Sequence, residues 1–149
     1  MNSSAPTAEQ IPQLRRLWQQ TFHDSDAYLD AFFSLAFSES RCRCLTDQGR
    51  VLSCLYWFDA TFCNQPVAYL YAISTDPAFQ GRGLCKMLME DTHRHLSHNG
   101  YRAAILVPGE ESLFSFYSKL GYQNFSAIKK FSAVSGGDTI PLQKISSKE

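Results

Sequence analysis

The chain has 149 residues, 44% of them hydrophobic, so it is long enough to bury a core and is expected to form one domain over residues 1–149. Fourteen Lys and Arg residues balance fourteen Asp and Glu residues, and the net charge of zero argues against nucleic acid or an anionic membrane as a partner. There is no apolar run near the ~20 residues of a membrane span, no secretory signal before Glu9 and no disulfide-framework spacing among five cysteines, so we expect reduced thiols and a cytoplasmic protein.

The first predicted element is a helix. The polar segment up to Pro6 is expected to fray. Thr7 and Gln10 then form the pattern of a capping box, and Pro12 indicates that the helix starts late or bends. Its apolar stripe comprises Ile11, Leu14, Leu17 and Trp18.

A second helix is predicted after a cap at Asp24 or Ser25. Its helical spacing predicts that one apolar stripe faces inward and is widened by neighbouring positions. The stripe comprises Tyr28, Phe32, Leu35 and Ala36, and the widening positions are Leu29, Phe33 and Phe37.

Three strands are predicted next, over residues 41–46, 50–59 and 67–74. Turn residues separate them, and such short links favour an antiparallel meander. The middle strand is apolar on both of its alternating faces, which predicts cover on both sides of the sheet. One face would carry Val51, Ser53, Leu55 and Trp57, and the other Leu52, Cys54, Tyr56 and Phe58.

The stretch over residues 69–96 joins a strand, a glycine loop and a helix. Asp76 and Pro77 end the strand, and a helical stripe follows the loop at Cys85, Leu88, Met89, Thr92 and Leu96. The first amides of a helix have no partner within it, and the helix dipole is positive there. Glycine in the preceding loop lets a phosphate approach the backbone, so this stretch predicts an anion site.

The remaining elements complete the fold class. Asn99 and Gly100 end the helix, and a strand over residues 102–107 should run parallel to residues 67–74 through a right-handed crossover. A helix over 110–120 and strands over 122–131 and 139–145 follow. The prediction is an α+β, three-layer sandwich whose mixed, mostly antiparallel sheet carries helices on both faces.

Two motifs resemble those of the GNAT superfamily of N-acetyltransferases. Residues 80–85, Gln-Gly-Arg-Gly-Leu-Cys, resemble its pyrophosphate-binding signature: Gln80 and Gly83 fit, whereas Cys85 stands where the family has Gly or Ala. Residues 116–122 resemble its Phe-Tyr-x-x-x-Gly-Phe segment, with Tyr122 in the last place. The family begins with a short strand before its first helix, for which this N-terminus offers no convincing candidate.

The resemblance implies acetyl-CoA as cosubstrate and no metal. The backbone of Ile73, Ser74 and Thr75 would pair with the pantetheine amides as an added strand does. Arg82 would either add charge at a phosphate or be solvated. Backbone amides would hold the pyrophosphate along the loop and first helical turn, at Gln80, Gly81, Arg82, Gly83, Leu84 and Cys85.

The resemblance also implies an acyltransferase that moves the acetyl group to a primary amine by direct attack in a ternary complex. Tyr117 is the predicted general acid for the departing thiolate, because a phenol and a thiol have similar reference pKa values. The base is open, since Val67 occupies the place of a glutamate that some members use. Water held by Tyr69 or Tyr71, or a carboxylate of Glu110 or Glu111, are the candidates, although acids at a helix start also suit the dipole.

Alternatives remain at this stage. The missing base and Cys85 also suit a non-catalytic acyl-CoA-binding or sensing module. The aromatic second helix could form a core face, one wall of the acceptor pocket, or a contact with a partner. The chain could also form a homodimer. The acceptor could be a small-molecule or a peptide amine. His93, His95 and His98 do not share one helix face and Cys42 and Cys44 suit ordinary packing, so neither set predicts a metal.

Overall fold

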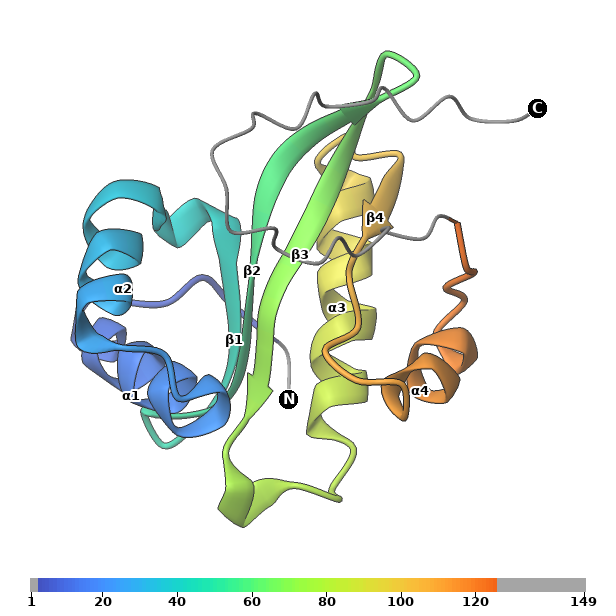
Figure 1. Ribbon diagram of the computed structural model, residues 1–149. Coiled ribbons are helices and arrows are strands. Elements are labelled where there is room, and N and C mark those ends of the chain that lie inside the picture. The colour runs from blue at the N-terminus through green and yellow to red at the C-terminus, as the bar shows by residue number, and fades with distance from the viewer. Residues whose placement is uncertain (1–2, 126–149) are drawn as a thin grey trace, which may run out of the picture.

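The computed structural model describes residues 3–125, in which a four-stranded sheet has the order β1-β2-β3-β4. β1 (Cys42–Asp47), β2 (Arg50–Phe62) and β3 (Gln65–Thr75) form an antiparallel meander. β4 (Ala103–Ile105) lies parallel to β3 over three residue pairs (Figure 1). The predicted mixed, mostly antiparallel sheet is confirmed. Of the strand expected over residues 122–131, residues 122–125 are described and form no strand, and its remainder and the strand expected over 139–145 lie outside the described residues.

Helices cover both faces of this sheet, as predicted (Figure 1). α1 (Ile11–Phe22) and α2 (Asp26–Ala31) lie on one face. α3 (Leu84–His98) and α4 (Leu113–Lys119) lie on the other. α1 follows a 3-10 turn at Ala8–Gln10, so the helix does start late, and the capping box of Thr7 and Gln10 forms. α3 is the crossover that makes β4 parallel to β3.

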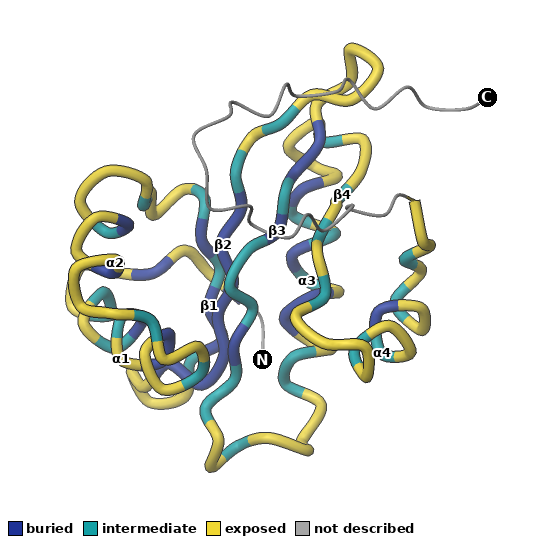
Figure 2. Tube along the Cα trace, viewed as in Figure 1, coloured by how far each residue is buried: buried dark blue, intermediate teal, exposed yellow. Residues whose placement is uncertain are grey.

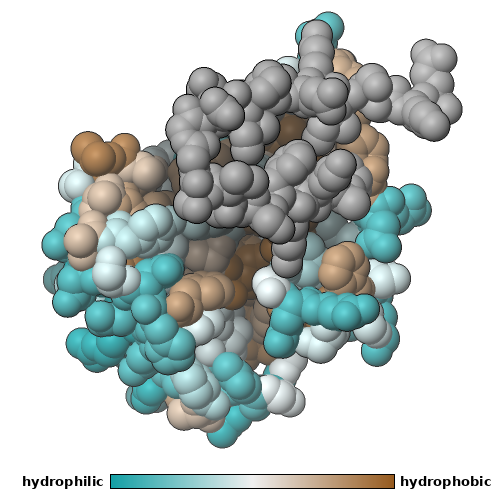
Figure 3. Space-filling view, in the orientation of Figure 1, coloured by the Kyte–Doolittle hydropathy of each residue, from teal (hydrophilic) through white to brown (hydrophobic). Residues whose placement is uncertain are grey.

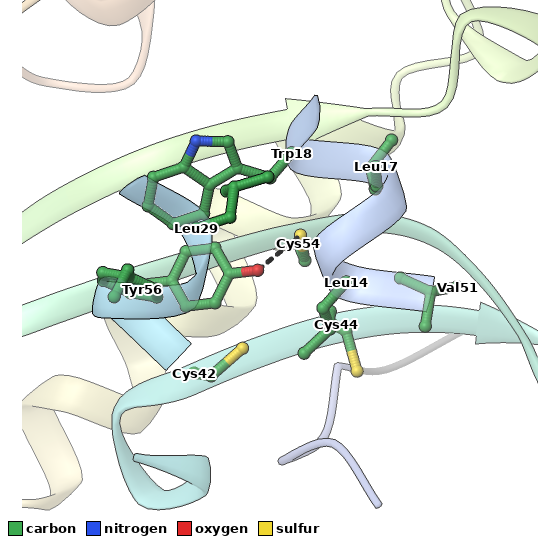
Figure 4. Close-up of a cluster of buried hydrophobic side chains, with 10 residues drawn as sticks. Leu14, Leu17, Trp18, Leu29, Cys42, Cys44, Val51, Cys54 and Tyr56 are labelled. Atoms are coloured by element: carbon green, nitrogen blue, oxygen red, sulfur yellow. Dashed lines mark hydrogen bonds between the residues drawn. The ribbon is translucent and has the colours of Figure 1, made fainter. Parts of the chain in front are cut away.

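Each face of the sheet has its own core, and the strands between them are buried (Figure 2). On the α1–α2 face, Trp18 packs against Tyr56 at a ring-centroid distance of 5.2 Å (Figure 4). It also packs against Phe32, at 4.5 Å. On the α3–α4 face, Leu88 and Met89 of α3 pack against the sheet. Burial on both faces explains why β2 reads as a continuous apolar run.

One extra residue in β2 corrects the predicted alternation. Leu45 pairs with Ser53 but Thr46 pairs with Val51, so Leu52 is a bulge. The bulge moves Val51 to the α1–α2 core with Cys54 and Tyr56, instead of the face of Leu55 and Trp57. The alternation of residues along the sequence does not reveal a bulge, because a bulge depends on pairing with another strand.

The second helix also departs from its prediction. Ser25 is its cap, and its hydroxyl accepts a hydrogen bond from the amide of Tyr28 at 3.2 Å. After Ala31 the helix widens into a π-helical turn over Phe32–Ala36. That turn shifts the phase of the stripe, so Leu35 is 86% exposed rather than buried.

The N-terminal segment is anchored rather than frayed. Ser4 and Cys44 exchange two backbone hydrogen bonds of 3.0 and 2.9 Å, a one-residue antiparallel bridge along the edge of β1. Ser3 is buried, and its amide donates to the carboxylate of Asp91 at 2.8 Å. The polar residues at this terminus therefore contact β1 and α3, and the contact of Ser3 is buried.

We expect Thr92→Val to stabilise the protein by about 1 kcal/mol, because its buried hydroxyl has no hydrogen-bond partner among residues 3–125. Thr21→Val is the matched control, since the Thr21 hydroxyl donates to the Leu17 carbonyl at 2.8 Å and its loss should be destabilising. Urea unfolding with an unchanged m-value measures both. A destabilised Thr92→Val variant would show that the hydroxyl is satisfied in solution.

Candidate functional site

The candidate site begins where the pairing between β3 and β4 ends. The two strands pair only from Val67 with Ala103 to Tyr69 with Ile105, and β3 then continues alone on that side to Thr75. Within this stretch β3 carries a bulge, at which Ala72 has a φ of +47°. A non-glycine residue in this region is strained and marks a place that the surrounding structure holds in position. Among the described residues, no strand covers this edge of β3 beyond Tyr69.

The predicted pantetheine-pairing residues lie along this edge. Ile73 contacts the α3–α4 core, whereas the Ser74 carbonyl already accepts from the Ser53 hydroxyl at 2.8 Å. The Thr75 carbonyl accepts from the Gln80 side chain at 3.3 Å. The Thr75 carbonyl has a second lone pair, so another partner can still bind there, whereas Ser74 pairs with Cys54 of β2. Gln80 thus closes the loop onto the end of β3, a role its place in the motif does not reveal.

The glycine loop opens onto free backbone amides. Gly81 and Gly83 both have a φ of +74°, and no described atom lies within 4 Å of where a Cβ would stand on either. Gly83 is the N-cap of α3, and the first helical bond runs from the Met87 amide to its carbonyl at 3.0 Å. The amides at the start of α3, of Leu84, Cys85 and Lys86, therefore have no partner within the helix.

Two arginines and a phenylalanine stiffen this loop. The guanidinium groups of Arg50 and Arg82 both lie over the Phe79 ring, at 4.9 and 5.0 Å from its centroid. Arg50 also binds Asp76 at 2.7 Å, and the Asp76 carboxylate accepts from the Ala78 amide at 3.0 Å. Sequence reasoning missed Arg50, because it lies at the start of β2 and no motif connects it to the loop. Asp76 balances the charge of Arg50, so Arg82 is the cation that adds positive charge beside the helix N-terminus.

Tyr117 lies in the same core cluster as the end of the loop. The tyrosine is 8% exposed and shares the α3–α4 core with Ile73, Leu84 and Cys85. Its hydroxyl makes no hydrogen bond to any other residue of 3–125. The fold therefore brings together β3, the first turn of α3 and α4, which carry three separate parts of the predicted site.

Burial sets the acidity of the groups at this point. It raises the pKa of Tyr117 to about 12, and a negative charge on Cys85 would contribute to the same shift. Burial likewise raises the pKa of the Cys85 thiol to about 11. Both shifts are in the same direction. The pKa values of the buried phenol and the buried thiol therefore stay close to each other, as their reference pKa values are.

Aromatic side chains form the α1–α2 face of β3. The Tyr28 and Tyr71 hydroxyls lie 2.6 Å apart, and burial, followed by this hydrogen bond, raises the pKa of Tyr71. Tyr69 lies beside Tyr71 at a centroid distance of 6.1 Å. Figure 3 shows apolar surface in a hollow at the middle of the molecule in this view, between the two helical layers.

The candidate bases are placed in different ways. Glu110 and Glu111 are exposed in the turn before α4, which starts later than predicted, and Glu110 accepts from the Ser112 hydroxyl at 2.8 Å. Between residues 65 and 75 no acid occurs. The structure adds Asp24, whose carboxylate accepts from Trp18 Nε1 at 2.8 Å and whose charge helps to raise the pKa of Tyr71.

The other singled-out residues have structural partners. His98 bonds the Arg94 carbonyl, and His95 packs against Trp57. Cys42 and Cys44 lie in the α1–α2 core, where burial raises the pKa of both thiols. Within residues 3–125, no group of three or more His, Cys, Asp or Glu side chains could hold a metal ion. No helix in that range is long and apolar enough to cross a bilayer.

A second hollow lies by the C-terminal end of α3, away from this site. Its lining includes Arg41, Trp57, Asp59 and Tyr101. These groups bind one another: Arg41 makes two 2.9 Å hydrogen bonds to Asp59, and Tyr101 also donates to Asp59. The hollow is therefore lined by a satisfied polar network.

Among the described residues, a glycine-bearing turn before a helix, an unpaired strand edge and a buried tyrosine therefore lie in one part of the fold. The model of the acetyltransferase (GNAT) domain matches residues 3–125. The chain belongs to this family, and the expected enzyme class, an acyltransferase, is confirmed. A comparison with curated protein sequences gives no significant match.

Solved structures agree with this fold. The aminoglycoside 6'-N-acetyltransferase AAC(6')-IG of Acinetobacter haemolyticus has a TM-score of 0.69 at 17% identity, over 89% of this chain and 98% of that one. Glucosamine-6-phosphate N-acetyltransferase of Arabidopsis thaliana has a TM-score of 0.65 at 18% identity, over 87% and 97%. The aminoglycoside N-acetyltransferase AAC(6')-Iy in complex with CoA has 0.69 at 18%, over 89% and 93%. At this identity the likeness establishes the fold.

Proposed function

We propose that the protein is an acetyl-CoA-dependent N-acetyltransferase that acetylates a primary amine by direct attack in a ternary complex. The observation that carries this proposal is the convergence of Tyr117, Cys85 and Ile73 in one cluster beside the glycine loop. Three segments that are separate in the sequence, β3, the start of α3 and α4, meet there. Each supplies what acyl transfer from a thioester requires: backbone groups, an anion site and an acid.

The residues at the loop fit the pyrophosphate of acetyl-CoA. A Cβ on Gly81 or Gly83 would enter open space that a phosphate needs, and the unpaired amides from Leu84 to Lys86 face an anion favourably. Arg82 is exposed next to this space, which favours its role as a phosphate cation. The uncovered edge of β3 from Ile73 to Thr75 suits the pantetheine arm.

The reaction then proceeds by one substitution at the acetyl carbon. The amine nitrogen forms a bond to the carbonyl carbon, the carbon–sulfur bond breaks, and the departing thiolate takes the proton of Tyr117. The amine gives up its extra proton to a base, for which water held by Tyr69 and Tyr71 or the Asp24 carboxylate is available. Both reactants are bound at the end of β3 that does not pair with β4. The chemical step therefore takes place within one complex and needs no bimolecular encounter.

The acceptor approaches from the aromatic face. Tyr28, Tyr69 and Tyr71 surround the α1–α2 side of β3, and such rings bind an ammonium group or an apolar carrier. This supports the second helix as one wall of the acceptor pocket. Small-molecule amines fit the family, because the three neighbours above are named for aminosugar and aminoglycoside acceptors.

A non-catalytic CoA-binding module is the second candidate, because β3 offers no carboxylate. A mass-spectrometric screen of a metabolite mixture for acetylated products separates the two. Turnover of any amine supports the transferase. Tight CoA uptake with no product from any amine supports the binding module.

We expect calorimetry to detect CoA binding that Gly83→Ala weakens about tenfold, because the new Cβ enters the phosphate space. Gly49→Ala is the matched control: Gly49 has a φ of +80° and equally open surroundings, but lies in the β1–β2 turn. Both variants should lose similar stability, about 1 kcal/mol. Equal CoA affinity in the two variants, or no binding by the wild type, would reject the loop as the site.

A further inference from the structure

We propose that His93 and Tyr122 are positioning residues for Tyr117, holding the segment that carries the acid against the helix that carries the anion loop. Tyr122 Oη and His93 Nε2 lie 2.7 Å apart. Within residues 3–125, this is the one side-chain hydrogen bond that joins α3 to residues 113–122. The inference rests on the proposed function, since it concerns the placement of the predicted acid.

Tyr122 is connected to Tyr117 in two ways. Its amide donates to the Tyr117 carbonyl at 3.1 Å, in the turn that Gly121 closes with a φ of +92°. The two rings also touch edge to face, with centroids 5.7 Å apart and an interplanar angle of 70°. A restraint on the Tyr122 ring is therefore passed to both the backbone and the side chain of Tyr117.

The α4 segment needs such a restraint. The helix has seven residues, which is too short to be stable without tertiary contacts. It packs through the buried Tyr117 and through Leu113 and Phe116, which are only partly buried. The hydrogen bond to α3 adds a directional restraint to this apolar packing.

The hydroxyl of Tyr122 is a departure from the phenylalanine pattern that residues 116–122 resemble. His93 lies on α3, more than two turns after the Gly83 cap, and the imidazole and phenol rings are 5.5 Å apart. Both side chains are half-buried. The hydrogen bond therefore connects α3, the helix that begins at the glycine loop, to the segment that carries Tyr117.

We expect Tyr122→Phe and His93→Phe each to lower kcat about 10- to 100-fold, since a displacement of about 1 Å at the acid costs this much. CoA affinity measured by calorimetry should stay within about twofold of the wild type, because the loop is untouched. Amide hydrogen exchange in α4 of the free protein should speed up in both variants, which tests the restraint without any substrate.

A double-mutant cycle separates positioning from general destabilisation. In a Tyr117→Phe background, Tyr122→Phe should cost nothing further in kcat, because there is no acid left to position. Tyr101→Phe is the matched control: it also removes a hydrogen-bonded hydroxyl, shared with Trp57 and Asp59, but lies at the second hollow. Its kcat should stay within about twofold of the wild type.

Several results would overturn the inference. These are wild-type kcat in Tyr122→Phe, unchanged α4 exchange in both variants, or a loss of kcat that persists undiminished in the Tyr117→Phe background. Absence of CoA binding by the wild type would instead reject the proposed function, and the exchange experiment would still decide whether the His93–Tyr122 contact restrains α4.

Discussion

Tyr117→Phe is expected to lower kcat by about 10²- to 10⁴-fold, the usual contribution of a general acid. The phenol is 8% exposed in the α3–α4 core beside Cys85, so the loss of its hydroxyl leaves the departing thiolate without a proton donor. The phenylalanine ring keeps the packing against Phe116 and Tyr122. Steady-state kinetics with an acceptor found by the product screen measures the effect.

The binding of CoA distinguishes this role from a structural one. Calorimetry should give the Tyr117→Phe variant nearly the CoA affinity of the wild type, because the glycine loop and the amides at the start of α3 are unchanged. The midpoint of urea unfolding should also change little. Equal turnover in the variant and the wild type would remove Tyr117 from the mechanism, and joint loss of turnover and CoA binding would indicate a packing role.

Asp91→Ala is expected to destabilise the protein by about 3–5 kcal/mol, because it leaves the charge of Arg43 unpaired in a largely buried place. The Arg43 guanidinium lies 3.2 Å from the Asp91 carboxylate, and their side chains are only 16% and 14% exposed. The same carboxylate accepts from the amide of Ser3. Urea unfolding measures the loss. Glu90→Ala is the control on the same helix, since its pair with Lys86 is exposed and should contribute less than about 1 kcal/mol.

Asp91 also makes stability depend on acid. Burial by itself would raise its pKa, but hydrogen bonds from Ser3, Arg94 and Arg43 outweigh burial and lower the pKa from 3.8 to about 2. A carboxyl with a lowered pKa in the folded state stabilises the protein above its unfolded pKa, and this contribution is lost as the pH falls from about 4 to 2. The wild type should therefore lose about 1–2 kcal/mol more than Asp91→Ala between pH 5 and 2. Parallel losses in the two proteins would contradict this assignment.

Local patterns in the sequence determined the layered fold and the candidate loop. Turn residues near Gly49 and Asn64 and the apolar runs between them fixed a meander, and the stripe from Cys85 to Leu96 fixed the crossover helix. The glycine loop and the tyrosine of α4 were identified by their motifs. These features depend on neighbours within a few residues, so the chain itself encodes them.

Only the tertiary structure decided the features that depend on pairing between distant segments. The bulges at Leu52 and Ala72 arise from register with another strand, and the anchoring of Ser3 arises from Asp91 across the sheet. Arg50 joins the loop, and His93 meets Tyr122, for the same reason. No periodicity records such contacts, because the residues that make them are far apart along the chain and meet only when the layers pack.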